Sequence, residues 1–149
     1  MKKQTSRVAD ILDLKGHTVF TIKPNETVET LSRRLKQKQI GAMAVSDDGE
    51  TLFGIVSERD VAYGVAAHRG ELHTLPVSAL MTTKVITCTP EDSLETAAKM
   101  MSALRVRHLP VTDGNKLVGV IAMRDIIGHR LEAIQRTSRL VGNLVAPEH

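Results

Sequence analysis

Short β-branched runs alternate along this chain with segments whose apolar residues recur at helical spacing. Val19 to Ile22 is such a run and is soon followed by a proline, which predicts a short strand. A helix is expected next, because the Thr27 hydroxyl can cap a first turn and Val28, Leu31 and Leu35 fall on one face. The pattern therefore predicts a strand followed by an amphipathic helix.

Two further strands and a second helix are predicted after this helix. Ala42 to Val45 and Phe53 to Val56 are apolar runs of strand length, and the turn sequence Asp47-Asp48-Gly49 lies between them. The second helix is expected to begin near Glu58. The first half of the chain is therefore predicted to fold as strand, helix, strand, strand, helix.

The second half of the chain repeats the first. The matched pairs of segments are 18–24 with 84–90, 27–30 with 93–96, 40–47 with 106–113, and 54–60 with 119–125. Val8–Leu12 also resembles Val77–Met81, with three extra residues in the first copy. In the second copy the expected elements are strands at 85–87, 109–112 and 117–121, and helices from Ser93 and from Met123. So many ordered matches indicate an internal duplication.

Four segments follow from this duplication. The first repeat is predicted at residues 8–67, a linker at 68–76, the second repeat at 77–135, and a partly helical tail at 136–149. Between Gly128 and Val145, a helix is expected to carry Leu131, Ile134 and Leu140 on one side. We expect this part of the chain to be a packing or dimer element and not a separate domain.

Composition narrows the class of protein. The 149 residues are 42% hydrophobic and 25% charged, as in ordinary globular proteins. Phe20, Phe53 and Tyr63 are the only aromatic residues, so the core must be aliphatic. The 20 Lys and Arg against 17 Asp and Glu give a net charge of +3, which is too small and too scattered for a nucleic-acid surface. A few basic residues at one phosphate pocket fit this balance better.

Cysteine content and hydropathy bear on the cellular location. Cys88 is the only cysteine, which excludes a disulfide framework and a thiolate metal cluster. No apolar run approaches the roughly 20 residues of a membrane span, and residues 1–7 are basic but lack the apolar stretch of a signal peptide. A cytoplasmic protein without a membrane partner is therefore expected.

The third strand of each copy ends in a motif that suits a phosphate. Gly54 is followed by two apolar residues, Ser57, two polar residues and Asp60. Such a strand-to-helix turn gathers backbone amides at a helix N-terminus, which attracts phosphate. Asp60, one turn later, can accept both hydroxyls of a ribose. The structural alternative is a helix N-cap with a first-turn acid, which stabilises a helix by about 1 kcal/mol.

This motif, present twice in a β-α-β-β-α order, resembles the CBS domain, which is named after cystathionine β-synthase. Arg105–Asp113 is also similar to the second strand of that family, and the resemblance covers roughly Val8 to Glu132. It implies a mixed α/β (α+β) fold in which two CBS repeats pack pseudo-symmetrically through their sheets, called a Bateman module. It also implies a protein that is not an enzyme and binds adenine nucleotides in two clefts between the repeats.

The resemblance further implies that each cleft is composite, with the phosphate and ribose motif from one repeat and much of the adenine pocket from the other. The residues implied for the first cleft are Ser57, Arg59, Asp60, Lys84, Val85, Ile86, Val106, Arg107, His108 and Pro110. The residues implied for the second cleft are Thr18, Val19, Phe20, Ile40, Gly41, Ala42, Ala122, Arg124 and Asp125.

The two clefts are not expected to be equivalent. Ala122 replaces the hydroxyl residue of the motif, and Gly41 and Ala42 stand where the first cleft has Arg107 and His108. Hydrogen bonds to charged groups contribute roughly 1.5–3 kcal/mol each. The second cleft is therefore predicted to bind a phosphate more than about tenfold more weakly than the first. It is expected to prefer a nucleoside-like part, to bind weakly or to stay empty.

Other reactive residues receive structural interpretations. The histidines outside the first cleft show no metal-ligand spacing, and Cys88 lies in an expected strand without a paired base, so neither a metal site nor a catalytic residue is predicted. The basic run Arg33–Lys38 is interpreted as a solvated helix face.

The expected function is that of a regulatory adenine-nucleotide sensor without a catalytic cofactor. AMP is the first choice of ligand, with ADP, ATP or an NAD-type ligand as alternatives. A homodimer and a separate effector protein are the expected macromolecular partners. A ligand-independent interaction scaffold, a small enzyme and a nucleic-acid-binding protein are the rival hypotheses. The presence of Ser57, Asp60, Arg107 and His108 favours the sensor over the scaffold.

Overall fold

The computed structural model describes residues 6–145 of the chain, and their side chains as far as residue 142. The elements are, in order, α1 (Val8–Lys15), β1 (Thr21–Ile22), α2 (Val28–Lys38), β2 (Ala42–Val45), β3 (Gly54–Ser57), α3 (Glu58–His68), the 3₁₀ turns η1 (Arg69–Thr74) and η2 (Val77–Ala79), α4 (Leu94–Leu104), β4 (His108–Asp113), β5 (Lys116–Ala122) and α5 (Met123–Val145).

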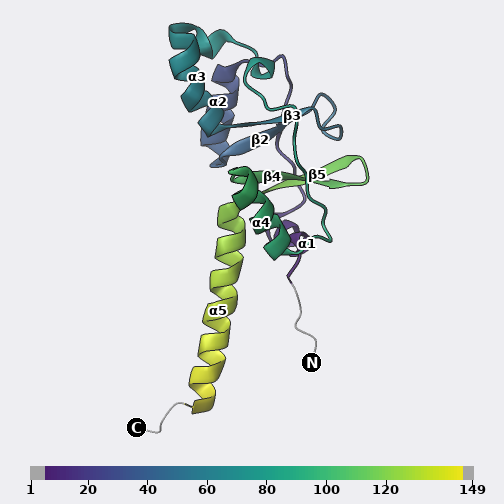
Figure 1. Cartoon of the computed structure of the whole chain (residues 1–149), viewed down its shortest axis with the longest axis vertical. Helices are drawn as coiled ribbons and strands as arrows, with labels where there is room; N and C mark the ends of the chain where they lie inside the picture. The colour runs from purple at the N-terminus through teal and green to yellow at the C-terminus, as the bar shows by residue number, and fades with distance from the viewer. Residues whose placement is uncertain (1–5, 146–149) are drawn as a thin grey trace.

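Two small sheets lie next to each other at the centre of the molecule, with α2 and α3 beside one and α1 and α4 beside the other (Figure 1). In the first sheet β1 runs parallel to β2, and β2 runs antiparallel to β3. In the second sheet β4 and β5 form a hairpin. The mixed α/β fold of two repeats is therefore confirmed.

The first strand of each repeat is shorter than predicted. Only Thr21 and Ile22 pair with β2 in the first repeat. In the second repeat the expected strand at 85–87 is wrong, and Cys88 alone bridges to Val111 in the equivalent parallel position. Val85 and Ile86 are thereby left outside the hydrogen-bonded sheet, and both line a pocket described below.

The predicted helix caps are confirmed in both repeats. The Thr27 hydroxyl accepts from the Thr30 amide at 3.2 Å, and the Ser93 hydroxyl accepts from the Thr96 amide at 3.0 Å. Each bond satisfies one of the amides that a first helical turn leaves without a partner. These two helices present their apolar faces to two separate cores.

The core of the second repeat contains α1, the helix with which the predicted first repeat begins. Val8, Ile11 and Leu12 of α1 are buried together with Leu94, Ala97, Met101, Leu109 and Ile121. Backbone bonds strengthen the attachment, since the Val8 amide donates to the Asp92 carbonyl at 2.9 Å. Helix α1 is therefore part of the second core, although the next elements along the chain, β1 and α2, belong to the first core.

The reverse exchange occurs in the first core. Val77, which begins the matching segment at the start of the second repeat, is buried against Ile22 and Leu31. The Val77 amide donates to the Glu26 carbonyl at 2.8 Å, and Thr82 bridges to Ile55 of β3. Each repeat therefore completes its core with a segment that leads into the other repeat.

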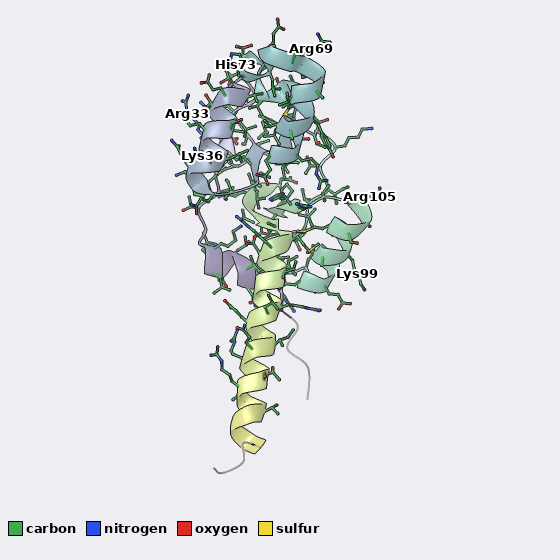
Figure 2. The ribbon with its side chains drawn as sticks, turned by 90° about the vertical axis from the view of Figure 1, so that its left-hand side faces the viewer. Arg33, Lys36, Arg69, His73, Lys99 and Arg105 are labelled. Carbon is green, nitrogen blue, oxygen red and sulfur yellow. The ribbon has the colours of Figure 1, made fainter. Side chains whose placement is uncertain are left out.

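The predicted tail is the end of α5, which runs without a break from Met123 to Val145 and projects away from the body of the molecule (Figures 1 and 2). Residues 146–149 of that tail lie outside the described residues. Leu131 and Ile134 are 53% and 62% exposed. Leu140 does not share their side, because nine residues at 3.6 per turn place it about half a turn from Leu131. None of the described helices is long and apolar enough to cross a membrane.

The exchanged helix provides a test of the fold. Ile11→Ala should lower the free energy of unfolding by about 2–5 kcal/mol, because Ile11 is 2% exposed in the second core. Leu14→Ala on the same helix should change it by less than about 0.5 kcal/mol, because Leu14 is 71% exposed. Urea denaturation of both variants makes the comparison. Similar losses from the two substitutions would contradict the packing of α1 on the second repeat.

Candidate functional site

A pocket of about 490 Å³ lies between the two repeats, within the size range of small-molecule sites. Its wall combines the β3–α3 turn of the first repeat with residues 82–86 and 104–109 of the second repeat. Folding brings the polar residues of the β3–α3 turn, Ser57 and Asp60, next to apolar residues that precede β4 in the second repeat. This pocket is the first cleft.

The first cleft contains every residue predicted for it except Pro110. The predicted residues that line it are Ser57, Arg59, Asp60, Lys84, Val85, Ile86, Val106, Arg107 and His108. Pro110 is buried within β4, opposite Val120 of β5, and does not line the pocket. The sequence-based prediction for the first cleft missed seven residues of its wall. The only available signal was that most of them lie close in sequence to predicted residues. They are Gly41, Ile55, Glu58, Ala62, Thr82, Leu104 and Leu109.

Ser57 and Asp60 form a reciprocal cap at the start of α3. The Ser57 amide and hydroxyl donate to Asp60 Oδ2 at 2.8 and 3.1 Å, and the Asp60 amide donates to Ser57 Oγ at 3.3 Å. These bonds orient the carboxylate and leave Asp60 Oδ1 without a hydrogen bond among the described residues. The motif therefore acts as a helix N-cap with a first-turn acid, as its structural interpretation predicted. This cap leaves Oδ1 of Asp60 available for a ligand.

Fewer backbone amides are available at this helix N-terminus than expected. The Glu58 amide donates to the Gly41 carbonyl at 2.9 Å, and the Asp60 amide is held by Ser57. A phosphate in the first cleft would therefore depend mainly on side-chain cations. Lys84, Arg107 and Arg59, all exposed at the pocket wall, are the groups of this kind.

Arg59 and Arg124 connect the repeats to each other. Arg59 Nη1 donates to the Arg105 carbonyl at 3.1 Å, and Arg124 Nη2 donates to the Gln39 carbonyl at 2.9 Å. Gln39 and Arg105 occupy the same place in the two repeats, with left-handed φ values of 54° and 55° at the ends of α2 and α4. Each arginine of the motif thus binds the helix end of the opposite repeat while it lines a cleft.

His108 lies between the two clefts. A Cβ atom added to Gly41 would lie 2.9 Å from the His108 ring, so the ring occupies space that only a glycine leaves free. His108 lines the first cleft, the second cleft and an adjoining groove of about 610 Å³. Burial lowers the pKa of His108, and the nearby Glu58 carboxylate opposes that shift. The ring therefore favours the neutral form more than an exposed histidine does.

The second cleft is much smaller, about 90 Å³. The predicted residues that line it are Thr18, Val19, Phe20, Ile40, Gly41, Ala42, Ala122 and Arg124. Asp125 is not among the residues that line this pocket, although its partner Lys15 is. Asp125 Oδ2 accepts from the Ala122 amide at 2.8 Å and from Lys15 Nζ at 2.9 Å. Lys15, which the sequence did not indicate, also lines the cleft.

The remaining candidates have structural roles. Cys88 is buried, and burial together with the nearby Asp92 carboxylate raises the pKa of its thiol to about 12, which suppresses the reactive thiolate. Arg33 and Lys36 extend from the outer face of α2 (Figure 2), and Arg33 pairs with Glu29 at 3.1 Å. Within the described part of the chain, no three His, Cys, Asp or Glu side chains converge on a possible metal site.

Comparison with known proteins gives one consistent family. The sequence model of the CBS domain matches residues 8–67 and 77–132. The CBS domain-containing protein YhcV of Bacillus subtilis is 34% identical over 119 residues, which cover 80% of this chain and 84% of YhcV.

Solved structures agree with this result. A CBS-domain protein from Agrobacterium tumefaciens, ATU1752, superposes with a TM-score of 0.81 at 30% identity, over 87% of this chain and 97% of that one. The CBS domain pair of protein MJ0100, solved in complex with 5′-methylthioadenosine and S-adenosyl-L-methionine, has a TM-score of 0.74 at 24% identity, over 89% and 99% of the two chains.

The environment of His108 predicts a pH dependence of stability. Because its pKa in the folded chain is lowered, the unfolded chain binds a proton at this histidine first as the pH falls below about 6.5. The free energy of unfolding should therefore fall with pH in this window. The His108→Gln variant should lack this pH-dependent contribution to the free energy of unfolding. The His73→Gln variant, which is changed at an exposed position, should retain it. Urea unfolding at about pH 7 and about pH 5.5 makes the comparison. The same pH dependence in wild type and His108→Gln would contradict the prediction.

Proposed function

Since the chain belongs to the CBS-domain family, we propose that it is a non-catalytic regulatory module that binds an adenine nucleotide in its first cleft. The observation that carries this proposal is the composite pocket of about 490 Å³. It combines an oriented carboxylate, Asp60, with the cations Lys84 and Arg107 and with apolar residues from the other repeat. A nucleotide offers the matching groups, namely a diol, a phosphate and an aromatic base.

Each part of the nucleotide has a chemical counterpart in the first cleft. The free Oδ1 of Asp60 would accept from the ribose hydroxyls, because an ionised carboxylate is a strong acceptor. Val85, Ile86 and Val106 would cover the adenine, and burial of Ile86, which is 49% exposed, would add to the affinity. The complex of the MJ0100 domain pair with two adenosine-containing molecules supports this class of ligand for the same fold.

AMP is the ligand that we propose, with ADP, ATP and an NAD-type dinucleotide as alternatives. A ligand that contacts both Asp60 and Arg107 would couple the two repeats and favour one arrangement of them. A separate effector protein would respond to that arrangement, so the module would report the cellular level of the nucleotide. The single buried Cys88 is in keeping with action in the reducing cytoplasm.

We further propose that the module is a homodimer joined through α5. Ile127, Leu131, Ile134, Ser138 and Val141 follow one another at intervals of four, three, four and three residues. This is the heptad spacing of a coiled-coil seam, which packs against a helix with the same spacing. The four apolar members of this α5 seam are 51–62% exposed. A second copy of α5 is therefore the proposed partner.

Two neighbouring features favour a second copy as the partner. The charged residues of α5 after Gly128, namely Arg130, Glu132, Arg136 and Arg139, lie outside the α5 seam, so two basic helices could meet without charges in the seam. Near the body of the molecule, the seam continues into a groove of about 480 Å³ between α4 and α5, in which apolar residues outnumber the polar ones Glu95, Lys99, Ser102 and Arg130. Ile127 and Leu131 belong to both the seam and the groove.

Nucleotide binding can be tested by two matched substitutions. Asp60→Asn should weaken AMP binding at least about tenfold in titration calorimetry, because a charged hydrogen bond to the ribose is lost. Asp125→Asn removes the corresponding carboxylate of the second repeat and should leave AMP binding nearly unchanged, because Asp125 does not line the first cleft. ADP, ATP and NAD are titrated in parallel. Equal losses from the two variants would refute the assignment, and a wild-type chain that binds no nucleotide would favour the scaffold.

The dimer can be tested by making the same leucine-to-glutamate substitution on two different sides of α5. Leu131→Glu places a charge in the α5 seam and should convert the dimer to a monomer in sedimentation velocity. Leu140→Glu makes the same chemical change at a position of similar exposure, 64%, on the other side of α5, and should leave the dimer intact. A monomeric wild type, or a dimer that survives Leu131→Glu, would exclude this interface.

A further inference from the structure

We propose that Lys15 acts as an internal occupant of the second cleft and keeps it closed to nucleosides. This inference rests on the proposed nucleotide function and adds the residue that distinguishes the two clefts. It concerns the carboxylate of Asp125, which holds the position in the second repeat that Asp60 holds in the first.

Lys15 is the last residue of α1 and points its ammonium group at the second motif. Its Nζ lies 2.9 Å from Asp125 Oδ2 and donates to the Val120 carbonyl at 3.1 Å. The helix that delivers it is fixed to the second core by Val8 and Ile11, which are 0% and 2% exposed. The short distance between Lys15 and Asp125 therefore follows from a rigidly anchored element and not from a chance surface contact.

The first cleft also contains a lysine, Lys84, but not the corresponding contact. Lys84 follows the segment Val77–Met81 by three residues, as Lys15 follows Val8–Leu12, whereas the match of 18–24 with 84–90 pairs Lys84 with Thr18. After Ala79 the chain leaves its 3₁₀ turn, and Thr82 bridges to β3, so no helix carries Lys84 toward Asp60. The ion pairs of the described residues include Lys15 with Asp125 and none between Lys84 and Asp60.

Occupation by Lys15 has two consequences for a ligand. The ammonium group pairs with Oδ2 of the carboxylate that would accept from ribose hydroxyls and so offsets its charge, although Oδ1 has no hydrogen bond among the described residues. The Lys15 side chain also lines a cavity of about 90 Å³. A nucleoside must therefore displace Lys15 before it binds. Its apparent dissociation constant is the intrinsic value divided by the fraction of molecules in which Lys15 has moved away. The ion pair is partly exposed, with Lys15 at 37% and Asp125 at 17%, so the closed state is favoured modestly.

The experiment isolates the second cleft and opens it. Adenosine is titrated calorimetrically into Asp60→Asn, whose first cleft is impaired, and into Asp60→Asn with Lys15→Met. Methionine keeps most of the aliphatic length of lysine without its charge. Adenosine is used because it lacks a phosphate that Lys15 could attract. We expect Lys15→Met to tighten adenosine binding about three- to tenfold, and this gain should disappear when Asp125→Asn is added.

A matched control removes another lysine–carboxylate pair. Lys116 pairs with Glu50 at 3.2 Å away from both clefts, so Lys116→Met in the Asp60→Asn background should leave adenosine binding unchanged. Unchanged or weaker binding on Lys15→Met, or no binding before and after it, would overturn the proposal. The proposed function is judged separately, by the loss of AMP binding between wild type and Asp60→Asn. One proposal can therefore fail without the other.

Discussion

Each repeat of this protein completes its hydrophobic core with a segment that leads, along the chain, into the other repeat. Val8 and Ile11 are buried in the second core, and Val77 is buried in the first. Neither repeat can therefore separate from the other without exposing apolar surface, at a cost of roughly 25 cal/mol per Å². This exchange holds the β3–α3 turn of one repeat against residues 82–86 of the other, and so it creates composite clefts.

The same constraint explains why a duplicated sequence produces two unequal sites. The exchanged segment of the first copy is an eight-residue helix that ends with Lys15 at Asp125. That of the second copy is a single 3₁₀ turn, which leaves Asp60 without an ammonium partner among the described residues. Gly41 adds to the difference, because its missing side chain lets His108 occupy the space between the clefts. One large and one small cleft are thus built from nearly the same secondary structure.

Local sequence predicted the elements well because their signals are local. The caps at Thr27 and Ser93 and the turn that ends β3 each depend on residues a few positions apart. The predicted walls of the clefts came from internal alignment and family resemblance, and most of them meet in space. Pro110 does not line the first cleft because it is buried in the β4–β5 hairpin opposite Val120. Lys15 was missed because its contact with Asp125 joins residues 110 positions apart along the chain. No pattern of neighbouring residues carries that information.

The central claim is that the first cleft alone is open to a nucleotide. The most direct measurement is the stoichiometry of AMP binding to the wild-type chain, by titration calorimetry at concentrations well above the dissociation constant. The account predicts one AMP per chain, bound in the cleft of about 490 Å³. Two equivalents of equal affinity per chain would contradict it, because the cleft that contains Lys15 would then be as accessible as the first.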